Sequence, residues 1–293
     1  MQTLDEYLNE HYSKTAITGY QYMIGQYLAY MGKEAKKAMY QDVLNYIGYL
    51  RTKQLHPKTL RNNLFAIKIY YRWLAATGQR NDHPCQDLNL QDKINRSIAV
   101  ENLYTMKELE EFLEQYEPKH SFLKQRDKTI ISLLIYQALT VLEISQLETN
   151  NIDLEKGTIY IKGNVKNKSR TLSLKPNQIM LLHKYITETR AVLLSRNENL
   201  EHEDKNALVL SQSGTKIQHH SISRQINYGK PGHRKMQPLK IRQSVIAHLL
   251  KQNNDLRIVQ VFAGHRRAAS TEEYKQTGLE ELKTSIQRHH PLQ

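Results

Sequence analysis

The chain has 293 residues, with 42 Lys and Arg against 29 Asp and Glu, a formal net charge of +13 and one cysteine. This length suffices for two domains with separate cores, and so basic a balance points to nucleic acid rather than to an anionic membrane surface. The sequence argues against a membrane or disulfide-rich protein, because no apolar run approaches the roughly 20 residues of a spanning helix and residues 1–5 do not resemble a signal peptide.

The first part of the chain is predicted to be helical. Apolar residues recur at helical spacing from Ala16 to Met31 and again from Tyr40 to Leu50, and Gly32 marks the end of the first run. Pro57 stands at the start of a third helix that covers Thr59 to Ala76. We therefore expect a helical N-terminal domain.

The third helix carries cations next to aromatic residues. It carries the cations Lys58, Arg61, Lys68 and Arg72 alongside Tyr70, Tyr71 and Trp73. Either the aromatic side chains form a core and the cations are solvated, or the helix faces a groove of nucleic acid. Residues 1–100 contain 13 Lys and Arg against 8 Asp and Glu, so both halves of the chain are basic. A protein that closes around DNA from two sides needs this distribution.

The helical periodicity fades over residues 81–103, which are mostly polar. We predict that this segment links an N-terminal domain over residues 1–80 to a second domain over residues 104–293. The second domain opens with Thr105 and Glu108, which have the spacing of a helix capping box.

The second domain is predicted to be mainly α with a small antiparallel β-sheet. A helix is expected from Phe122 to Leu139. Residues 157–163 alternate in character and, after a basic polar turn, residues 169–174 follow, which together predict a β-hairpin. Pro176 opens another helix, and helices resume near Ser221.

Helix signals near the C-terminus fix the position of one histidine. Asp255 can cap a helix from Leu256 to Ala263, and Gly264 ends that helix. His265 therefore stands where the chain leaves the helix.

Two further residues in this region have side chains suited to phosphodiester chemistry. Ser270 and Glu273 have the spacing of another capping box, which would place Tyr274 in the first turn of the next helix. A guanidinium such as that of Arg242 binds phosphate oxygens, the imidazole of His265 moves a proton, and a phenol attacks phosphorus.

The stretches around these residues resemble the C-terminal signature of the tyrosine recombinases, the phage-integrase family. The stretches are Pro238-Leu-Lys-Ile-Arg-Gln, Ala263-Gly-His, and Thr271-Glu-Glu-Tyr, whose tyrosine lies nine residues after the histidine. The resemblance covers most of the chain and implies a helical, SAM-like core-binding domain followed by an integrase-type catalytic domain. It implies that Tyr274 forms a 3′-phosphotyrosyl bond with DNA and frees a 5′-hydroxyl, without metal or cofactor.

The resemblance also assigns roles to individual residues. Arg242 would grip the scissile phosphate, and His265 would serve in proton transfer. Lys168, in the Lys-Ser-Arg sequence after the hairpin turn, would reach into the minor groove and protonate the leaving 5′-oxygen. Lys166 and Arg170 of the same segment are expected to contact DNA.

Two positions depart from the family pattern. The first catalytic arginine of the family falls on Thr140, the glycine before it falls on Ala138, and the supporting Glu143 is retained. The histidine that usually precedes the second arginine falls on Leu239. Threonine brings no positive charge, so another cation is needed to offset the loss. The candidates, which the sequence does not rank, are Arg126, Arg170, Arg266 and Arg267.

Three functions follow from these observations. The first is a site-specific DNA recombinase or integrase, the second is a weakened pseudo-recombinase that binds DNA or an active paralogue, and the third is a topoisomerase of related chemistry. The expected partner is double-stranded DNA in a prokaryotic cytoplasm and nucleoid. The resemblance implies a homo-tetramer on synapsed DNA, or assembly with a paralogous recombinase. A short helix over residues 278–288 is expected to dock on a neighbouring protomer.

Overall fold

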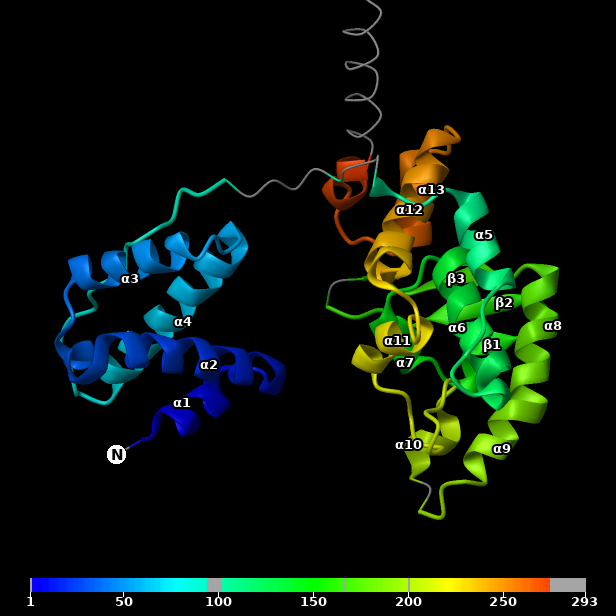
Figure 1. Ribbon diagram of the computed structural model, residues 1–293, viewed down its shortest axis with the longest axis horizontal. Coiled ribbons are helices and arrows are strands. Elements are labelled where there is room, and N and C mark those ends of the chain that lie inside the picture. Colours follow the sequence, from blue (N-terminus) through cyan, green and yellow to red (C-terminus); the bar gives the residue numbers. More distant parts are fainter. Residues whose placement is uncertain (1, 94–97, 99–101, 166, 200, 275–293) are drawn as a thin grey trace, which may run out of the picture. The chain divides into compact units, whose positions relative to one another are not determined.

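The structure is a computed structural model that describes residues 2–93, 98, 102–165, 167–199 and 201–274 (Figure 1). Internal contacts divide the chain into two units, Met1–Asn95 and Arg96–Gln293, and each is described by itself. Both are mainly helical, and the second also contains a three-stranded antiparallel sheet in the order β1-β2-β3. The predicted fold class is confirmed. No helix in the described ranges is long and apolar enough to cross a membrane.

The first unit contains the three helices expected from the sequence and one that was missed. The helices are α1 (Leu4–His11), α2 (Lys14–Met31), α3 (Tyr40–Thr52) and α4 (Pro57–Ala76), with a 3-10 turn over Gly32–Lys37. The missed helix, α1, has only eight residues, and it begins with a capping box between Thr3 and Glu6. Its short length leaves little periodic signal.

Tyrosine side chains form much of the core of the first unit. Tyr27 of α2 and Tyr71 of α4 are buried, and their hydroxyl oxygens lie 2.6 Å apart. The Tyr71 hydroxyl donates to the Ala35 carbonyl at 2.9 Å. Tyr70 and Tyr71 of α4 therefore belong to the core and Trp73 packs partly buried against it, as one of the two interpretations had it. Cys85 and Leu88 pack into the same core, so the unit extends past the boundary predicted at residue 80.

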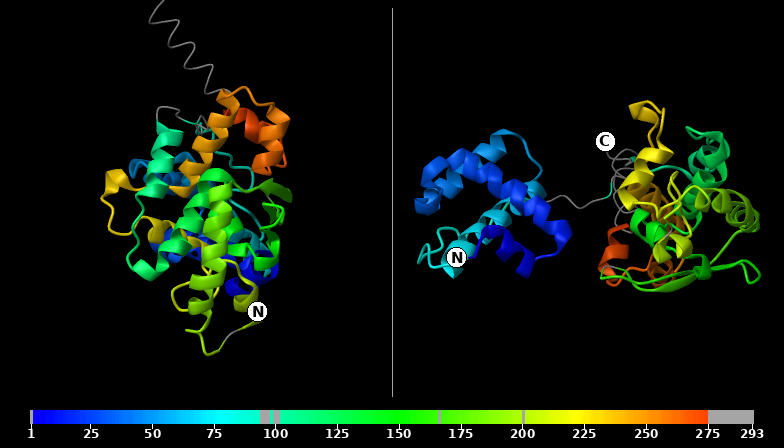
Figure 2. Two further views of the ribbon diagram at one scale, coloured as in Figure 1. Left: turned by 90° about the vertical axis from the view of Figure 1, so that its right-hand side faces the viewer. Right: turned by 90° about the horizontal axis from the view of Figure 1, so that it is seen from below.

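The second unit is built from helices and strands with short 3-10 and π turns between them, and a further helix begins at Ala269 (Figures 1 and 2). In chain order they are α5 (Met106–Glu114), α6 (Lys124–Tyr136), α7 (Val141–Gln146), β1 (Ile152–Asp153), β2 (Thr158–Ile161), β3 (Arg170–Ser173), α8 (Pro176–Lys184), α9 (Arg190–Leu194), α10 (His202–Asn206), α11 (His219–Ile226), α12 (Pro238–Lys251) and α13 (Leu256–Ala263).

Helix α6 forms the centre of this unit. Its residues 129–135 are all buried, and α5, α8 and α12 pack against it. The helix is shorter at both ends than the predicted span from 122 to 139. It ends at Tyr136, and the chain then turns through Ala138, which has a positive φ of 49°. This turn leads directly into α7.

The predicted hairpin is present as β2 and β3, with β1 as an additional edge strand. Ile159 and Ile161 face the core, whereas Tyr160 between them is 44% exposed, as expected for alternating strand residues. Ile161 of β2 pairs with Arg170, the first residue of β3, and both residues are buried. Strand β3 contacts α13, which brings the hairpin next to the C-terminal helices.

Candidate active site

Arg242 lies on α12 and is held by two main-chain carbonyls. Pro238 occupies the start of this helix, where its missing N–H costs nothing. The Arg242 side chain is buried, and Nη1 donates to the Ala138 carbonyl while Nη2 donates to the Ala263 carbonyl at 2.6 Å. The guanidinium therefore joins the turn before α7 to the end of α13, and burial lowers the pKa of Arg242 from its ordinary value.

His265 follows α13, whose two ends are formed as predicted. The Asp255 carboxylate accepts from the amide of Arg257 at 2.7 Å, and Gly264 ends the helix with a φ of 71°. This left-handed conformation suits glycine. His265 Nδ1 lies 2.9 Å from the Thr271 hydroxyl, which orients the imidazole ring.

Tyr274 is buried, and its ring lies beside the His265 ring. The two ring centroids are 6.1 Å apart, and the rings are inclined by 21°. The predicted capping box at Ser270 is wrong, because the helix begins earlier, at Ala269, and the Ser270 amide donates to the Arg267 carbonyl. Tyr274 is therefore in the second helical turn rather than the first.

The electrostatics of this pair favour a neutral imidazole beside a protonated phenol. Burial, followed by the charges of Arg242 and Arg170, lowers the pKa of His265 to about 4. Burial raises the pKa of Tyr274, and the charge of Arg242 partly opposes this. At neutral pH the imidazole is therefore uncharged and a weak base, and the nearby guanidinium favours the phenolate.

The carboxylate of Glu143 connects several parts of the site. Oε2 accepts from the Thr140 amide at 2.8 Å and lies 3.0 Å from the Thr140 hydroxyl. Oε1 accepts from Asn167 Nδ2 at 3.1 Å and from Arg170 Nη1 at 2.7 Å, and Arg242 Nη1 lies 4.0 Å from Oε2. Burial alone would raise the pKa of Glu143, but Arg170 and the Thr140 amide hold that pKa below its usual range.

The hairpin that carries Lys168 is joined to the His265 segment through the main chain. The Lys168 amide donates to the Gly264 carbonyl at 2.7 Å, and Asn167 forms an isolated β-bridge with His265. Arg266 Nη2 donates to the Asn164 carbonyl at 2.8 Å. The Lys168 side chain itself is exposed. The site thus brings Arg242, His265 and Tyr274 together, with the Lys168 main chain attached to them.

The structure places one of the expected DNA-contacting residues in the interior and gives two others contacts within the protein. Arg170 is not on the surface: its side chain is 1% exposed because it forms an ion pair with Glu143. On α4, Arg61 donates to the Asp92 carbonyl at 2.7 Å and Lys68 to the Gln86 carbonyl at 2.8 Å, so both fasten the segment that follows the helix.

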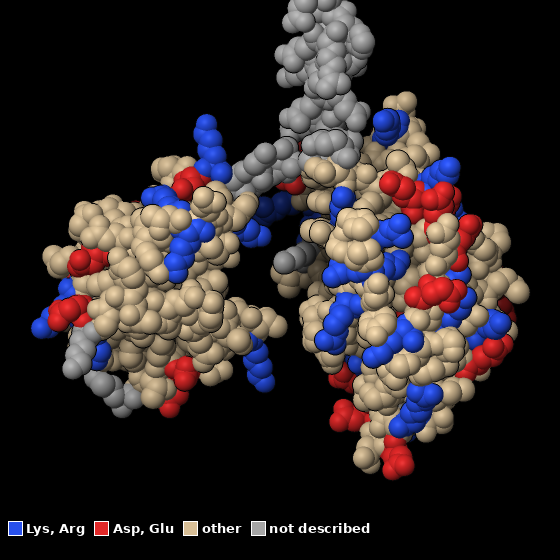
Figure 3. All heavy atoms as spheres, in the orientation of Figure 1, with Lys and Arg blue, Asp and Glu red and all other residues tan. Residues whose placement is uncertain are grey.

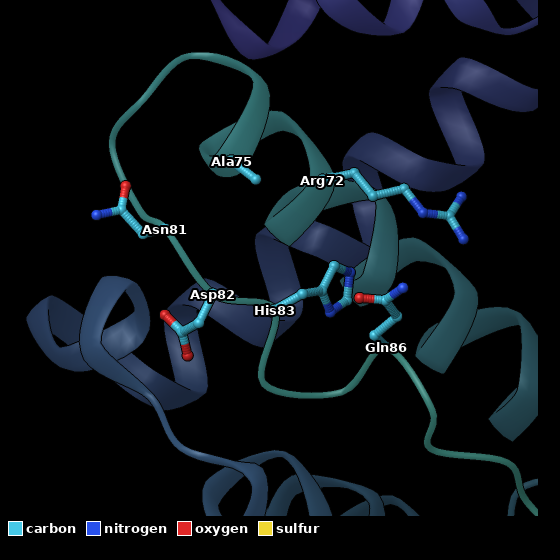
Figure 4. A pocket seen from close by; sticks show the side chains of 6 residues that line it. All are labelled: Arg72, Ala75, Asn81, Asp82, His83 and Gln86. Atoms are coloured by element: carbon cyan, nitrogen blue, oxygen red, sulfur yellow. The ribbon is translucent and has the colours of Figure 1, made fainter.

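The other two cations of α4, Lys58 and Arg72, are exposed. Arg72 lies over the Phe65 ring and lines a hollow between α4 and residues 81–86 (Figure 4). Lys166 lies outside the described residues, as does the predicted helix over 278–288.

The sequence reasoning missed Thr271 and Asn167. Thr271 lies three residues before Tyr274 on the same helix, so both side chains share one face, and this spacing could have identified it. Asn167 carries no comparable signal, because its contact with Glu143 joins residues 24 positions apart.

The sequence reasoning also missed a polar hollow in the second unit. It lies at the start of α11 and contains four hydroxyl side chains and three cations. The hydroxyls are those of Ser211, Ser213, Thr215 and Ser221, and the cations are Arg196, Lys216 and Arg224. Figure 3 shows Lys and Arg over the inner and middle part of the right-hand unit, and Asp and Glu at its upper right, in its middle, along its outer edge and at its lower end. Such a surface suits a polyanion.

No group of three or more His, Cys, Asp or Glu side chains within the described ranges is arranged to hold a metal ion. The cations and hydroxyls around Tyr274 suit an anionic substrate instead, since a phosphodiester offers only acceptor oxygens.

Comparison with known proteins matches both units. The model of the "Phage integrase family" matches residues 102–281, and the model of the "Phage integrase, N-terminal SAM-like domain" matches residues 1–79. Tyrosine recombinase XerC of Natranaerobius thermophilus is 24% identical over 304 residues, covering 99% of this chain and 94% of the relative. Tyrosine recombinase XerA of Pyrococcus furiosus is 26% identical over 289 residues, covering 96% and 90%.

Solved structures share the fold. XerH site-specific recombinase bound to difH substrate in a pre-cleavage complex gives a TM-score of 0.71 at 20% identity, covering 97% of this chain and 84% of that chain. Tn1549 transposon integrase in complex with a circular intermediate DNA gives a TM-score of 0.65 at 13% identity, covering 97% of this chain and 99% of that chain. Because the family model matches more than half of this chain, the chain belongs to the phage integrase family, the tyrosine recombinases.

Proposed function

We propose that this chain is a site-specific DNA recombinase that cuts and rejoins strands through a 3′-phosphotyrosyl bond at Tyr274. The observation that carries the proposal is the buried Tyr274 phenol beside a neutral His265 and within the field of Arg242. Double-stranded DNA is the proposed partner, in keeping with the basic charge of both units and with the DNA complexes of the structural neighbours.

The chemistry needs only side chains of the protein. The Tyr274 oxygen attacks phosphorus, its proton passes to a base such as the neutral His265 imidazole, and the bond to the 5′-oxygen breaks. Arg242 stabilises the charge on the phosphate oxygens, and Lys168 protonates the departing 5′-oxygen. The 5′-hydroxyl of a partner strand then attacks the phosphotyrosine and releases Tyr274. A phenol is a better leaving group than an alkyl alcohol, so this second transfer is not uphill.

The two departures from the family pattern affect rate more than mechanism. Thr140 caps α7 and brings no charge, and Leu239 is 66% exposed at the start of α12. Loss of one electrostatic donor costs about 3–4 kcal/mol in other enzymes, a factor of ~10²–10³. We therefore propose slow or conditional cleavage. The alternative of a non-cleaving pseudo-recombinase leaves the joint retention of Arg242, His265 and Tyr274 without a reason.

The test uses a nicked suicide duplex that carries the chain's own recombination site, since loss of the short strand traps the covalent adduct. Wild-type protein is expected to form an adduct, whereas Tyr274→Phe keeps the ring packing and DNA binding but forms none. A matched control is Tyr228→Phe, which removes an exposed phenol of the same unit. The proposal is falsified if Tyr274→Phe still yields covalent DNA, and a wild-type chain that never does so supports the pseudo-recombinase.

Assembly is a separate part of the proposal. We propose a homo-tetramer on synapsed DNA, or a mixed assembly with a paralogous recombinase, because two duplexes must each be cut on one strand before exchange. Light scattering of the protein with and without duplex DNA measures this. A complex that stays at one protomer per site under synapsis conditions would contradict it.

A further inference from the structure

The position that carries an arginine elsewhere in the family has a different task in this chain. Thr140 closes a capping box at the start of α7, and its hydroxyl accepts from the Glu143 amide at 3.2 Å. Its short side chain is therefore committed to the helix, and it has no charge. If the site binds a phosphodiester with two cations, the second must come from another residue.

Three of the four candidate arginines are engaged or placed elsewhere. Arg126 is buried in an ion pair with Asp127 at 2.6 Å, Nη1 donates to the Leu210 carbonyl, and Nη2 also donates to Gln225 Oε1. Arg266 is exposed and donates to the Asn164 carbonyl through two nitrogens. Arg267 is an exposed residue of the loop before the last helix.

Arg170 differs from these in its position and in its unused donors. Nη1 donates to Glu143 Oε1 at 2.7 Å, but Nε and Nη2 are buried and have no hydrogen-bond partner among the described residues. Buried guanidinium donors without an acceptor are unfavourable, so the arrangement favours arrival of a further anionic group. The side chain is 1% exposed, so it is held in place before any ligand arrives.

The glycine that ends α13 makes room for this side chain. A Cβ at Gly264 would lie 2.5 Å from Arg170 Nη1 and 3.0 Å from its Cζ. Arg170 therefore lies directly beneath the turn that leads to His265. Its charge is felt at the site, since it contributes to the lowered pKa of both His265 and Arg242.

The charges of this buried cluster suit one phosphodiester. Arg170 and Arg242 bring two positive charges, and both approach the single carboxylate of Glu143, at 2.7 and 4.0 Å. The cluster thus has one positive charge in excess, which a phosphodiester monoanion would balance. With only Arg242 and Glu143 the cluster would be neutral.

We infer that Arg170 supplies the second positive charge of the phosphate site, in place of the arginine that Thr140 lacks. This inference rests on the proposed function, and it assigns to one buried residue a role that the sequence left open among four. The competing explanation is that Arg170 only neutralises Glu143 and stabilises the fold.

The first test measures anion binding without DNA and so does not depend on cleavage. Inorganic phosphate is titrated into the full-length protein, and the ring resonances of His265 are followed by NMR. Arg170→Gln should weaken phosphate binding about tenfold or more, and Glu143→Gln, which leaves both cations, should strengthen it. Circular dichroism and thermal unfolding confirm that each variant is folded.

The double variant Glu143→Gln/Arg170→Gln separates the Arg170 donors from net charge and from fold. It removes both members of the ion pair and leaves the cluster with one positive charge in excess, as in wild type. A purely structural role, or an effect of net charge alone, therefore predicts restored stability together with phosphate binding like that of wild type. The inference, in which the Arg170 donors themselves bind the phosphate, predicts restored stability with binding still about tenfold weaker. Phosphate binding that is unchanged in either folded Arg170 variant overturns the inference.

Cleavage of the suicide duplex gives a second test, applied once wild-type adduct has been seen. Arg170→Gln should slow adduct formation ~10²–10³-fold. Thr140→Arg should restore much of the rate in the Arg170→Gln protein, yet slow the otherwise wild-type protein, because two guanidinium groups then compete for the same oxygens. If Thr140→Arg accelerates both proteins alike, no other cation occupies the space beside Thr140, and Arg170 does not supply the missing charge. Absence of any wild-type adduct would count against Tyr274 chemistry, while the phosphate titration still decides about Arg170.

Discussion

Ala138 has a backbone conformation that suits glycine better than alanine. Its φ is 49°, in the turn between α6 and α7, and its carbonyl accepts from Arg242. The left-handed region costs a residue with a Cβ about 1–2 kcal/mol. This strain therefore lies within the main chain that positions the buried guanidinium.

Ala138→Gly should cost less than an ordinary change of Ala to Gly. Relief of about 1–2 kcal/mol of strain offsets the ~0.4–1 kcal/mol that glycine adds to the entropy of the unfolded chain and the ~0.8 kcal/mol lost with a buried methyl group. Ala75→Gly, at an exposed position of α4, is the control and should destabilise by about 0.5–1 kcal/mol. Chemical denaturation of both variants measures the difference. A larger loss of stability in Ala138→Gly than in Ala75→Gly would show that the turn carries no strain.

His265 makes the stability of the fold depend on pH. Its pKa is lowered to about 4 in the folded state, whereas an unfolded histidine titrates near pH 6.5. Below about pH 6.5 the unfolded chain takes up a proton that the folded chain does not, so stability falls as the pH is lowered toward 4.

The expected loss is of the order of 2 kcal/mol at pH 4, reduced from the full linkage value because the ring is partly exposed. Glu143, whose pKa is also lowered, acts in the same direction. The difference in free energy of unfolding between wild type and His265→Asn isolates the histidine. That difference should change between pH 7 and pH 4. If it stays constant, folding does not lower the pKa of the His265 imidazole.

At the scale of single residues the sequence predicted those that belong to contiguous motifs. Arg242, His265 and Tyr274 lie within 33 positions of one another, and short stretches with fixed spacing identify them. The burial of Arg170 was not predictable in this way, because it depends on a carboxylate 27 positions earlier and on the space that Gly264 leaves. The sequence of a basic hairpin does not distinguish a cation that is exposed from one that is buried.

At the scale of elements, local signals located the helices better than their ends. The predicted caps at Thr105 and Asp255 form in the structure, because each links residues only two or three positions apart. The capping box expected at Ser270 does not form, since the helix starts at Ala269, where the loop from His265 allows an earlier turn. Strand β1 has only two residues and depends on its pairing with β2.

Docking of the hairpin on α13 depends on Gly264. This residue has a φ of 71°, and an added Cβ would meet both Arg170 and the Lys168 carbonyl. Its carbonyl also accepts from the Lys168 amide at 2.7 Å. The left-handed φ and the close contacts therefore both oppose a side chain at position 264.

Gly264→Ala is expected to destabilise the protein by about 2 kcal/mol or more, since both the left-handed φ and the contact with Arg170 oppose a Cβ. Gly25→Ala is the matched control: it lies exposed within α2 with open space around it, and should stabilise by about 0.5–1 kcal/mol. Thermal unfolding distinguishes the two. Equal, small effects would mean that the hairpin and α13 are not tightly packed.

At the scale of the whole molecule, both units are basic, and each has its own core. Residues 1–95 contain 12 Lys and Arg against 8 Asp and Glu, and the second unit carries the rest of the positive charge. A protein that uses both units on one duplex should show a salt dependence with contributions from each. The division into two units was predicted from a polar segment of the sequence, whereas the packing of Cys85 and Leu88 of that segment on the first core was not.

Lys58 and Arg72 provide a test of this two-sided binding in the full-length chain. Both are exposed on α4, so replacing them should leave the core intact. If each neutralises one phosphate, Lys58→Gln/Arg72→Gln should reduce the slope of log K against log salt by about 2, because each contact contributes roughly 0.9. The control is Lys14→Gln/Lys37→Gln, which removes two exposed lysines outside α4. Binding is measured by fluorescence anisotropy on one duplex between low and moderate salt. A slope reduced only by the α4 pair assigns that helix to the DNA interface, whereas equal slopes for both pairs would restrict specific contact to the second unit.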